Sequence, residues 1–244
     1  GTIFMELTDK KTTLRYEGRD KLIWESDNPE HLIIEYRTLT QTENGERTGV
    51  IPNKDIYINK INGNLFRHLE DNSVLTHYLG MLNERETVVR KLDIIPIELY
   101  VRNIAAGTLV ERLGVPEGTE FAAPVIEYYF KRPDLMSNPM INSSHAMAMK
   151  LCTSKDLDTI NYNAYRINRI LQHYLGKQNI LLVDFKIEFG KSHNRIILAD
   201  EISPDTCRFW DSITGEKLDK DRFRCNLGDV EEAYEEICKR LMRA

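Results

Sequence analysis

The stretch 183-VDFKIEF-189 alternates charged and apolar residues without a break. Side chains of successive strand residues point to opposite faces, so Asp184, Lys186 and Glu188 share one face. The other face carries four apolar residues, Val183, Phe185, Ile187 and Phe189. This pattern predicts a strand with one buried face, and most often the second face is simply solvated. Two carboxylates and one ammonium on that face also fit a functional site.

The residues after this strand predict an immediate return. Residues 192–194 (SHN) are prone to form a turn, because Asn tolerates the left-handed conformation that tight turns need. A three-residue loop would place Glu188 opposite Asp200, with Cβ atoms about 5 Å apart. A five-residue loop would instead place Asp184 opposite Asp200, again on the charged face. A two-residue turn would instead place Asp200 across from Ile187, on the apolar face.

Two opposed carboxylates repel each other unless a cation lies between them. Mg²⁺ prefers hard oxygen ligands, and it commonly binds one or two carboxylates together with substrate phosphates. We therefore predict a Mg²⁺ site at Glu188 and Asp200. The turn-like segment that follows contains Ser203, Asp205 and Arg208. Loops at strand ends often carry functional residues, which favours a site over a merely solvated face.

Two more segments could bind anions. Gly18 lies between strand-prone runs beside Arg19 and Lys21, so a glycine turn could offer backbone N–H groups and two cations to a phosphate. An ordinary hairpin turn with exposed bases explains the same residues. In the second segment, Arg102 ends a strand and Thr108 opens a short helix. With Thr108 as N-cap, helix N–H groups and a guanidinium would form an anion pocket, although a plain strand-to-helix connection fits equally well.

Composition narrows the class of protein. The chain has 244 residues, 41% of them hydrophobic, which suffices for one large core or two small ones. Its 33 basic and 38 acidic residues give a net charge of −5, so we expect no nucleic-acid partner. The four cysteines form no C-x-x-C pair, which is typical of reduced thiols. Residues 1–11 lack a signal-peptide core and no stretch is long enough to span a membrane, so we expect a cytoplasmic protein.

The pattern of elements predicts an α/β fold of the α+β type. Short strand-prone runs separated by turns fill residues 13–89, interrupted by one amphipathic helix over 57–71 in which Gly63 is a local weakness. Beyond them, strands mix with longer helices. We predict two lobes, a small antiparallel β-rich lobe over residues 1–90 and a larger α/β lobe over 91–244.

Two helices of the second lobe have clear ends. Ser154 is the expected N-cap of a helix whose stop is Gly176. A last helix over 229–243 begins with acidic residues and ends with basic ones, as the helix dipole favours.

Several long runs resemble the SAICAR synthetases, the phosphoribosylaminoimidazole-succinocarboxamide synthases of purine biosynthesis. The runs are RNIAAGT, EGTEF, LVDFKIEFG, LADEISPDTCRFWD and TGEKLDKDRFR, in this order along the chain. The resemblance implies an ATP-dependent ligase that joins the carboxylate of a carboxyaminoimidazole ribonucleotide to the amine of L-aspartate. It also implies that ATP binds between the two lobes, that Mg²⁺ takes part, and that the protein is a homodimer.

The resemblance extends to individual residues. Gly18, Arg19 and Lys21 match a phosphate-binding glycine turn, and a hinge that meets the adenine falls on Arg90 to Leu92. Glu188 and Asp200 match Mg²⁺-associated acids, and Lys186 matches a phosphate-facing lysine. The positions that hold the ribonucleotide phosphate are Arg102, Thr108 and Arg208. The imidazole and aspartate side of the site is lined by Asp184, Ser203 and Asp205, and we expect Lys186, Asp184 and Asp205 to be catalytic.

Two segments depart from the family pattern. Residues 38–43 replace an acidic run before Asn44-Gly45, and Asn138, Ser143 and Ser144 stand where acidic residues are frequent. These departures leave two alternatives to the ligase, a nucleotide-binding module without ligase activity and a small-molecule kinase.

Overall fold

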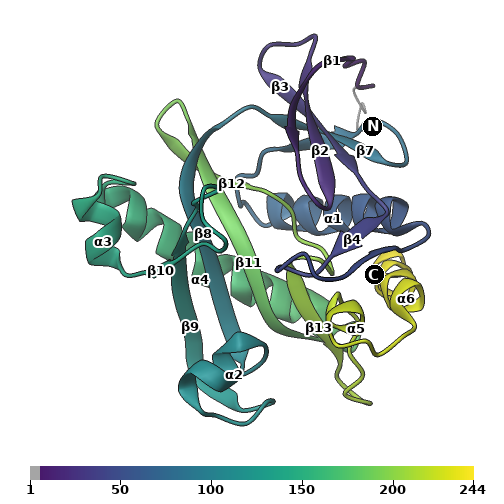
Figure 1. Cartoon of the computed structure of the whole chain (residues 1–244). Coiled ribbons are helices and arrows are strands. Elements are labelled where there is room, and N and C mark those ends of the chain that lie inside the picture. Colours follow the sequence, from purple (N-terminus) through teal and green to yellow (C-terminus); the bar gives the residue numbers. More distant parts are fainter. Residues whose placement is uncertain (1–5) are drawn as a thin grey trace.

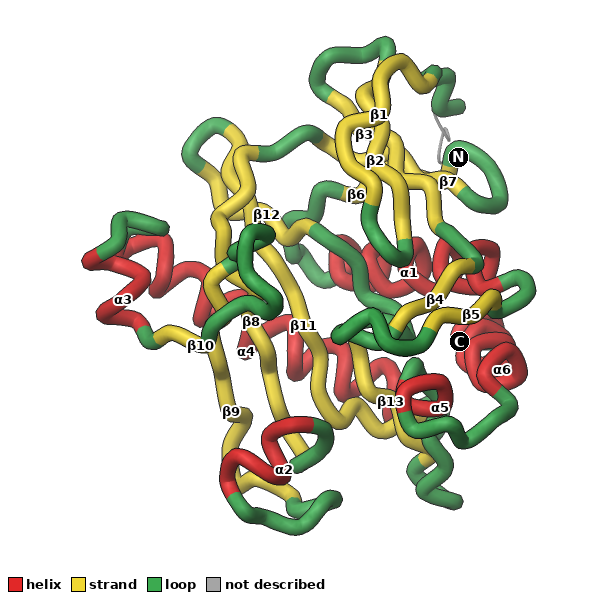
Figure 2. The backbone as a smooth tube through the Cα atoms, in the orientation of Figure 1, coloured by secondary structure: helices red, strands yellow, loops and turns green. Residues whose placement is uncertain are grey.

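Two large antiparallel sheets, one two-stranded hairpin and the helices around them make up the described part of the chain (Figures 1 and 2). The structure is a computed structural model that describes residues 6–244, so the beginning of the segment considered as a signal peptide lies outside it. The α+β class predicted from the sequence is confirmed. Among the described residues, no helix is long and apolar enough to cross a membrane.

The first sheet has five strands and lies entirely before residue 91. In spatial order it contains β1 (Lys11–Glu17), β2 (Lys21–Ser26), β3 (His31–Tyr36), β7 (Glu86–Arg90) and β6 (Tyr78–Met81). The strand β2 begins and ends at the same residues as the predicted run KLIWES. A separate hairpin consists of β4 (Leu39–Gln41) and β5 (Thr48–Val50).

The second sheet begins after residue 92. Its order is β10 (Met140–Ile141), β9 (Glu120–Phe130), β8 (Asp93–Ile104), β11 (Ile180–Ser192) and β12 (Arg195–Ala199), with β13 (Cys207–Asp211) also paired to β11. The opening stretch of sequence therefore lies within β11, the longest strand.

Within residues 6–244, six helices complete the fold: α1 (Lys54–Asp71), α2 (Thr108–Leu113), α3 (Ser143–Ala148), α4 (Ser154–Gly176), α5 (Asp221–Arg224) and α6 (Val230–Met242). The longest, α4, packs against β11 and β8 of the second sheet, while α1 packs against β3 and β6 of the first. Figure 1 shows α1 and α6 side by side, and their residues are in contact.

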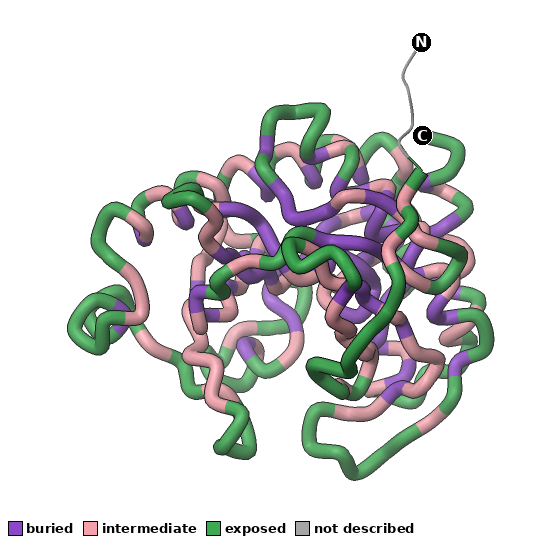
Figure 3. The backbone as a smooth tube through the Cα atoms, turned by 90° about the horizontal axis from the view of Figure 1, so that it is seen from above, coloured by how far each residue is buried: buried purple, intermediate pink, exposed green. Residues whose placement is uncertain are grey.

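One apolar core runs through both parts of the chain. It includes Ile34 and Leu65 from the first part together with Leu99 and Phe185 from the second. Buried segments accordingly gather in the middle of the molecule (Figure 3). The division into lobes at residues 1–90 and 91–244 stays a prediction: the sheets divide there, but the core does not.

The alternation in β11 is broken by a β-bulge. The register between β11 and β13 shifts between Leu182 and Asp184. As a result Val183 packs with Ile104 and Ala106 in a small second cluster, whereas Phe185 belongs to the main core. Our expectation that Val183 shares a face with Phe185 is wrong, because an extra residue in one strand reverses the alternation of faces.

Helix ends differ from the prediction by one to three residues, and α1 begins at Lys54 rather than at Tyr57. The N-cap of α4 is Thr153, which accepts a hydrogen bond from Asp156 N while Asp156 accepts one from Thr153 N. This reciprocal arrangement satisfies two N–H groups, and Ser154 is already helical. Gly176 is the last helical residue and Lys177 the C-cap. In α1, Gly63 permits close packing, since a Cβ there would lie 2.6 Å from the Tyr78 hydroxyl.

Candidate active site

β11 changes partners along one edge, and this change creates the site. β8 pairs with it along the other edge, while β13 pairs with its first half and β12 with its second half. Residues 200–206 connect β12 to β13 across the gap, where Lys186 N donates to Thr206 O at 2.9 Å. We call the charged face of β11 together with residues 200–206 the charged site.

The β11–β12 hairpin has the register that separates Glu188 from Asp200. His193 and Asn194 form a two-residue turn with φ of 50° and 64°, as mirror-image hairpin turns require. Glu188 is therefore opposite Ala199, and our prediction that it faces Asp200 across the hairpin is wrong. The acid that Glu188 faces in register is Glu98, on the other neighbouring strand β8.

Asp200 nevertheless reaches the charged face of β11. β12 ends at Ala199, and Asp200 takes a left-handed backbone with φ of 57°. Its carboxylate then lies 2.6 Å from Lys21 Nζ and 3.8 Å from Lys186 Nζ. The left-handed residue thus redirects a side chain that the strand alternation would send to the apolar face.

Three lysines surround the acids of the charged site. Lys131 Nζ lies 3.0 Å from Glu188 Oε2, Lys186 Nζ lies 3.6 Å from Glu98 Oε1, and Lys21 Nζ lies 3.0 Å from Glu201 Oε1. Glu98, Glu188, Asp200 and Glu201 are thus each within ion-pair distance of one of these ammonium groups.

The pKa values of the two acids predicted to bind metal shift in opposite directions. Burial alone would raise the pKa of Asp200, but the ammonium groups of Lys21 and Lys186 hold this pKa well below its usual range. Burial and the nearby charge of Asp200 raise the pKa of Glu188, against the effect of Lys131. Asp200 is therefore the firmly ionised member of the pair.

The residues present suit a hard cation. Within residues 6–244, Asp200 Oδ2 is a buried carboxylate oxygen that has no hydrogen-bond partner. A buried acceptor without a partner is unfavourable, and an oxygen-binding cation would satisfy it. Glu188 and Asp200 offer only oxygen ligands, as Mg²⁺ prefers.

At the other end of β11, Asp184 lies between two arginines. It is in register with Arg102 on β8 and with Arg208 on β13. Arg102 Nη1 lies 3.2 Å and Arg208 Nη1 3.1 Å from Asp184 Oδ2. Arg102 also donates from Nε to Glu127, and Arg208 donates to Asp221 Oδ2 at 2.7 Å. The bulge at this point of β11 brings both guanidinium groups onto one carboxylate.

A glycine and a helix start lie against Arg208. Gly107, the N-cap of α2, has φ of 63°, and a Cβ there would lie 2.5 Å from Arg208 Nη2. Thr108 is the first helical residue and makes no side-chain cap, so our expectation that Thr108 is the N-cap is wrong. Only glycine combines this backbone with room for the guanidinium. Arg102, Thr108 and Arg208 are thus brought to one end of the second sheet.

Asp205 and Ser203 are buried in the connection between β12 and β13. Asp205 Oδ2 lies 2.9 Å from the fully buried Lys54 Nζ of α1, and Asp205 Oδ1 accepts from Tyr234 of α6. Burial raises the pKa of Asp205, but Lys54 and Lys220 outweigh it and bring this pKa to about 2. Ser203 Oγ donates to Glu201 at 2.6 Å and accepts from Asp205 N. Both residues therefore stabilise the conformation of residues 200–206.

The glycine turn is a hairpin turn that also contacts the neighbouring loop. Gly18 N donates to Lys21 O at 2.9 Å, between β1 and β2. Arg19 is exposed and donates to Thr42 O at 3.2 Å, whereas Lys21 points into the charged site. The segment 38–43, which departs from the family pattern, reaches α5 through Glu43, whose Oε1 lies 2.7 Å from Arg224 Nε.

The predicted hinge connects the two sheets. Arg90 ends β7, and its N–H donates to His77 O at 2.7 Å. Leu92 covers Gly190 of β11, where a Cβ would lie 2.7 Å from Leu92 Cβ. The hinge therefore runs directly over the strand that carries Lys186 and Glu188.

Sequence reasoning missed five residues of this region: Lys54, His77, Glu98, Lys131 and Glu201. The sequence analysis assigned a site role to none of them. Glu98 could have been found by asking which residues of β8 (Asp93–Ile104) alternate outward. Glu201 directly follows Asp200 and could have been found as the next carboxylate of that segment. Lys54, His77 and Lys131 meet the site only through contacts between distant parts of the chain, for which the sequence carries no local signal.

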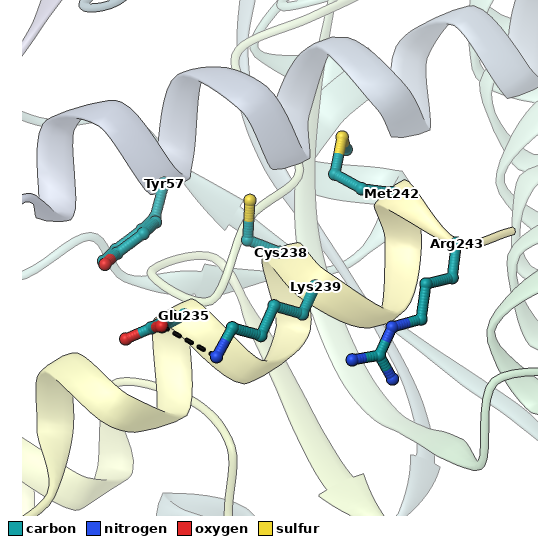
Figure 4. Close-up of a pocket in the computed structure, with 6 residues that line it drawn as sticks. All are labelled: Tyr57, Glu235, Cys238, Lys239, Met242 and Arg243. Carbon is teal, nitrogen blue, oxygen red and sulfur yellow. Dashed lines mark ion pairs between the residues drawn. The ribbon is translucent and has the colours of Figure 1, made fainter.

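A separate pocket of about 370 Å³ lies between α1 and α6 (Figure 4). It is lined by Tyr57, Glu235, Cys238, Lys239, Met242 and Arg243. None of the predicted site residues lines it, and its Glu235–Lys239 ion pair lies on the surface of α6. This pocket is not part of the charged site.

Comparisons with known proteins agree on one family. A family model described as SAICAR synthetase matches residues 14–241. The phosphoribosylaminoimidazole-succinocarboxamide synthase of Caldanaerobacter subterraneus subsp. tengcongensis is 47% identical over 234 residues, 96% of this chain and 99% of the relative. That of Thermoanaerobacter sp. (strain X514) is 48% identical over 232 residues, 95% of this chain and 98% of the relative.

Solved structures match most of the chain as well. The crystal structure of the enzyme from Ehrlichia chaffeensis superposes with a TM-score of 0.91 at 41% identity, covering 94% of this chain and 98% of that one. A SAICAR synthetase in complex with ADP gives a TM-score of 0.90 at 40% identity, covering 94% and 97%.

Proposed function

Because this chain belongs to the SAICAR synthetase family, we propose that the charged site binds Mg²⁺ and the phosphates of ATP during the family's reaction. The family catalyses an ATP-dependent ligation in purine biosynthesis, and this chain is a ligase of that kind. The reaction joins the carboxylate of a carboxyaminoimidazole ribonucleotide to the amine of L-aspartate and releases ADP and phosphate. The observation that carries the metal proposal is the buried Asp200 oxygen without a hydrogen-bond partner.

The chemistry requires an activated acyl group, since a carboxylate is a poor electrophile. Transfer of the γ-phosphoryl group of ATP to the substrate carboxylate makes a phosphate leaving group, and attack by the aspartate amine then expels it. Mg²⁺ held by Glu188 and Asp200 would neutralise phosphate charge during this transfer. Lys186 and Lys21, whose ammonium groups meet at Asp200, stabilise the remaining negative charge.

We assign the nucleotide and the ribonucleotide to opposite ends of β11. Gly18, Arg19 and Lys21 would meet the phosphates of ATP, and the backbone from Arg90 to Leu92 would meet the adenine. Arg102, Thr108 and Arg208 would hold the ribonucleotide phosphate beside Gly107, where two guanidinium groups and the start of α2 converge. This order along β11 would leave the reacting carboxylate near Lys186.

The predicted catalytic roles of Asp184 and Asp205 stay predictions, and their contacts favour a positioning role. Asp184 holds the two arginines, and Asp205 holds Lys54 and Tyr234. Ser203 is expected on the aspartate side of the site. Its Oγ accepts a hydrogen bond from the backbone N–H of Asp205 and so supports that residue. A homodimer and a cytoplasmic location also stay predictions; free thiols at all four cysteines are consistent with the latter.

The experiment that tests this proposal is an ADP-release assay with Glu188→Gln and Asp200→Asn. Each variant removes one negative charge while keeping the size of the side chain. We expect each to lower Mg²⁺-dependent turnover by about 100-fold or more, in the range typical for groups that stabilise transition-state charge. Circular dichroism should show an unchanged fold.

The control for the site is Glu117→Gln, which removes an acid paired with Lys217 on the surface, away from β11. Turnover of this variant should be unchanged. Near-normal rates in both Glu188→Gln and Asp200→Asn would contradict the metal site. ADP release that does not require aspartate would point to the kinase alternative.

A further inference from the structure

His77 is a buried histidine that contacts the charged site without belonging to β11 or to residues 200–206. It lies just before β6, with 5% of its surface exposed. Its Nε2 lies 2.9 Å from Asp200 O. Its backbone N donates to Leu198 O at 2.9 Å, and its backbone O accepts from Arg90 N at 2.7 Å. One residue therefore joins the end of β12 to the hinge.

The hydrogen bond to Asp200 has a fixed direction. A carbonyl oxygen can only accept, so His77 Nε2 carries the proton and donates it. The ring also packs against Phe66, with centroids 5.6 Å apart. The ring is thus a constant donor held in one orientation.

The carbonyl that receives this hydrogen bond belongs to the residue with the unusual backbone. The hairpin register would send the Asp200 side chain to the apolar face, and only its left-handed conformation turns the carboxylate toward Lys21 and Lys186. A left-handed conformation is disfavoured outside glycine and needs support from its surroundings. The donor at His77 fixes the peptide group that follows Asp200, and so supplies this support.

We propose that His77 is a positioning residue for Mg²⁺, holding the Asp200 backbone so that the carboxylate points at the metal. Through Arg90, the same residue links the metal position to the hinge expected to meet the adenine. The inference rests on the proposed Mg²⁺ site at Asp200. It adds a residue outside that site on which the affinity for the metal depends.

The test compares two replacements of His77. His77→Phe keeps a ring of similar size against Phe66 but cannot donate to Asp200 O, whereas His77→Gln keeps an N–H donor of similar reach. Calorimetry of ADP binding at increasing Mg²⁺ concentration is the readout, because it needs no turnover. We expect His77→Phe to raise the half-saturating Mg²⁺ concentration about 10-fold or more, the usual effect of losing support for a metal ligand. His77→Gln should stay within about 3-fold of the unaltered protein.

A merely structural role would not separate these two variants. ADP affinity measured without Mg²⁺ should be the same in both, since the change acts through the metal. His68→Phe serves as the matched control: His68 stacks on Tyr174 with centroids 3.8 Å apart, and no contact joins it to the charged site among the described residues. Its Mg²⁺ dependence should be unchanged. If His77→Phe does not fold, His77→Met is compared with His77→Gln in the same way.

The outcomes distinguish this inference from the proposed function. If Asp200→Asn leaves the Mg²⁺ dependence unchanged, the metal site itself is wrong. If Asp200→Asn weakens Mg²⁺ binding and folded His77→Phe does not, only the role of His77 is overturned. Equal losses in His77→Phe and His77→Gln would overturn the hydrogen bond as the cause.

Discussion

Single residues decide the geometry at both ends of β11. Asp200 reaches the charged face through one left-handed backbone, and Arg208 reaches Asp184 by passing over Gly107. Both positions depend on a positive φ in a connection next to a strand. Neither position is specified by the alternation within β11, which fixes only the faces of residues inside the strand.

At the residue scale, Gly107→Ala should displace the Arg208 guanidinium. Gly107 has φ of 63° and ψ of −146°, a backbone that a side chain disfavours by about 1–3 kcal/mol, and the added Cβ would meet Nη2 at 2.5 Å. We expect the KM for the ribonucleotide to rise about 10-fold or more, as misplacement of a phosphate-holding arginine would cause. Steady-state kinetics with the ribonucleotide varied would measure this.

Gly114→Ala is the control for that substitution. Gly114 also has a positive φ, 64°, but a Cβ there would have open space around it. We therefore expect Gly114→Ala to lower stability by about 1 kcal/mol without raising the KM. An unchanged KM in Gly107→Ala would show that Arg208 does not hold the ribonucleotide.

At the element scale, α4 supports the apolar face of β11, and its start is set by a capping box rather than by the residue we expected. Thr153 accepts from Asp156 N at 3.0 Å, and Asp156 Oδ2 accepts from Thr153 N at 3.1 Å. The sequence TSKD offers two hydroxyl residues in succession as caps. The N-cap is Thr153, because the residue three positions after it, Asp156, is acidic and the pair satisfies both N–H groups.

Thr153→Ala should therefore destabilise the protein by about 1 kcal/mol, the usual effect of removing an N-cap side chain. Urea denaturation followed by circular dichroism would measure the change. Ser154→Ala is the neighbouring control, and it should change the free energy of unfolding by less than about 0.5 kcal/mol. A larger effect at Ser154 than at Thr153 would reverse the assignment of the cap.

At the scale of the whole molecule, the fully buried Lys54 ties together segments distant in sequence. Its Nζ lies 2.9 Å from Asp205 Oδ2, 3.2 Å from Asp20 Oδ1 and 3.0 Å from Leu39 O. Tyr234 of α6 completes the cluster at Asp205. The first sheet, α1, the charged site and α6 thus meet at one buried ammonium, although their sheets are separate.

Lys54→Met should destabilise the protein by about 3 kcal/mol at pH 7, because it leaves the buried Asp205 carboxylate without its cation. The pKa of Asp205 is about 2 in the folded protein and about 3.9 in an unfolded chain. The stabilisation from this pair is therefore complete above about pH 4 and is lost as the pH falls through about 2. The difference between the two proteins should shrink over that interval.

Urea denaturation at a series of pH values would measure this difference. Lys60→Met, on the same helix, is the control, since no ion pair involves Lys60 among residues 6–244, and its effect should not depend on pH in this range. A difference for Lys54→Met that stays constant from pH 7 to pH 2 would contradict the role of the Asp205 pair.

Much of the fold could be predicted because its signals are local. The alternation in 183–189, the helical periodicity of 57–71 and 154–176, and the turns between short strands each depend on neighbours within a few residues. These patterns correctly predicted the α+β class and the antiparallel strands of the first sheet. The long runs shared with the SAICAR synthetases likewise identify the family from the sequence alone.

The sequence by itself determined which residues carry charge and, past the bulge at Val183, which residues lie on a common face of β11, because the backbone of a strand repeats every two residues. Only the tertiary structure decided which residues of neighbouring segments meet the charged face of β11. The two-residue turn at His193-Asn194 set a register that separates Glu188 from Asp200, and a left-handed Asp200, bonded to His77, brought the carboxylate back to the charged face. The physical reason is twofold: the same turn-prone residues allow loops of different length, and the left-handed Asp200 is bonded to His77, 123 positions away, which no local pattern encodes.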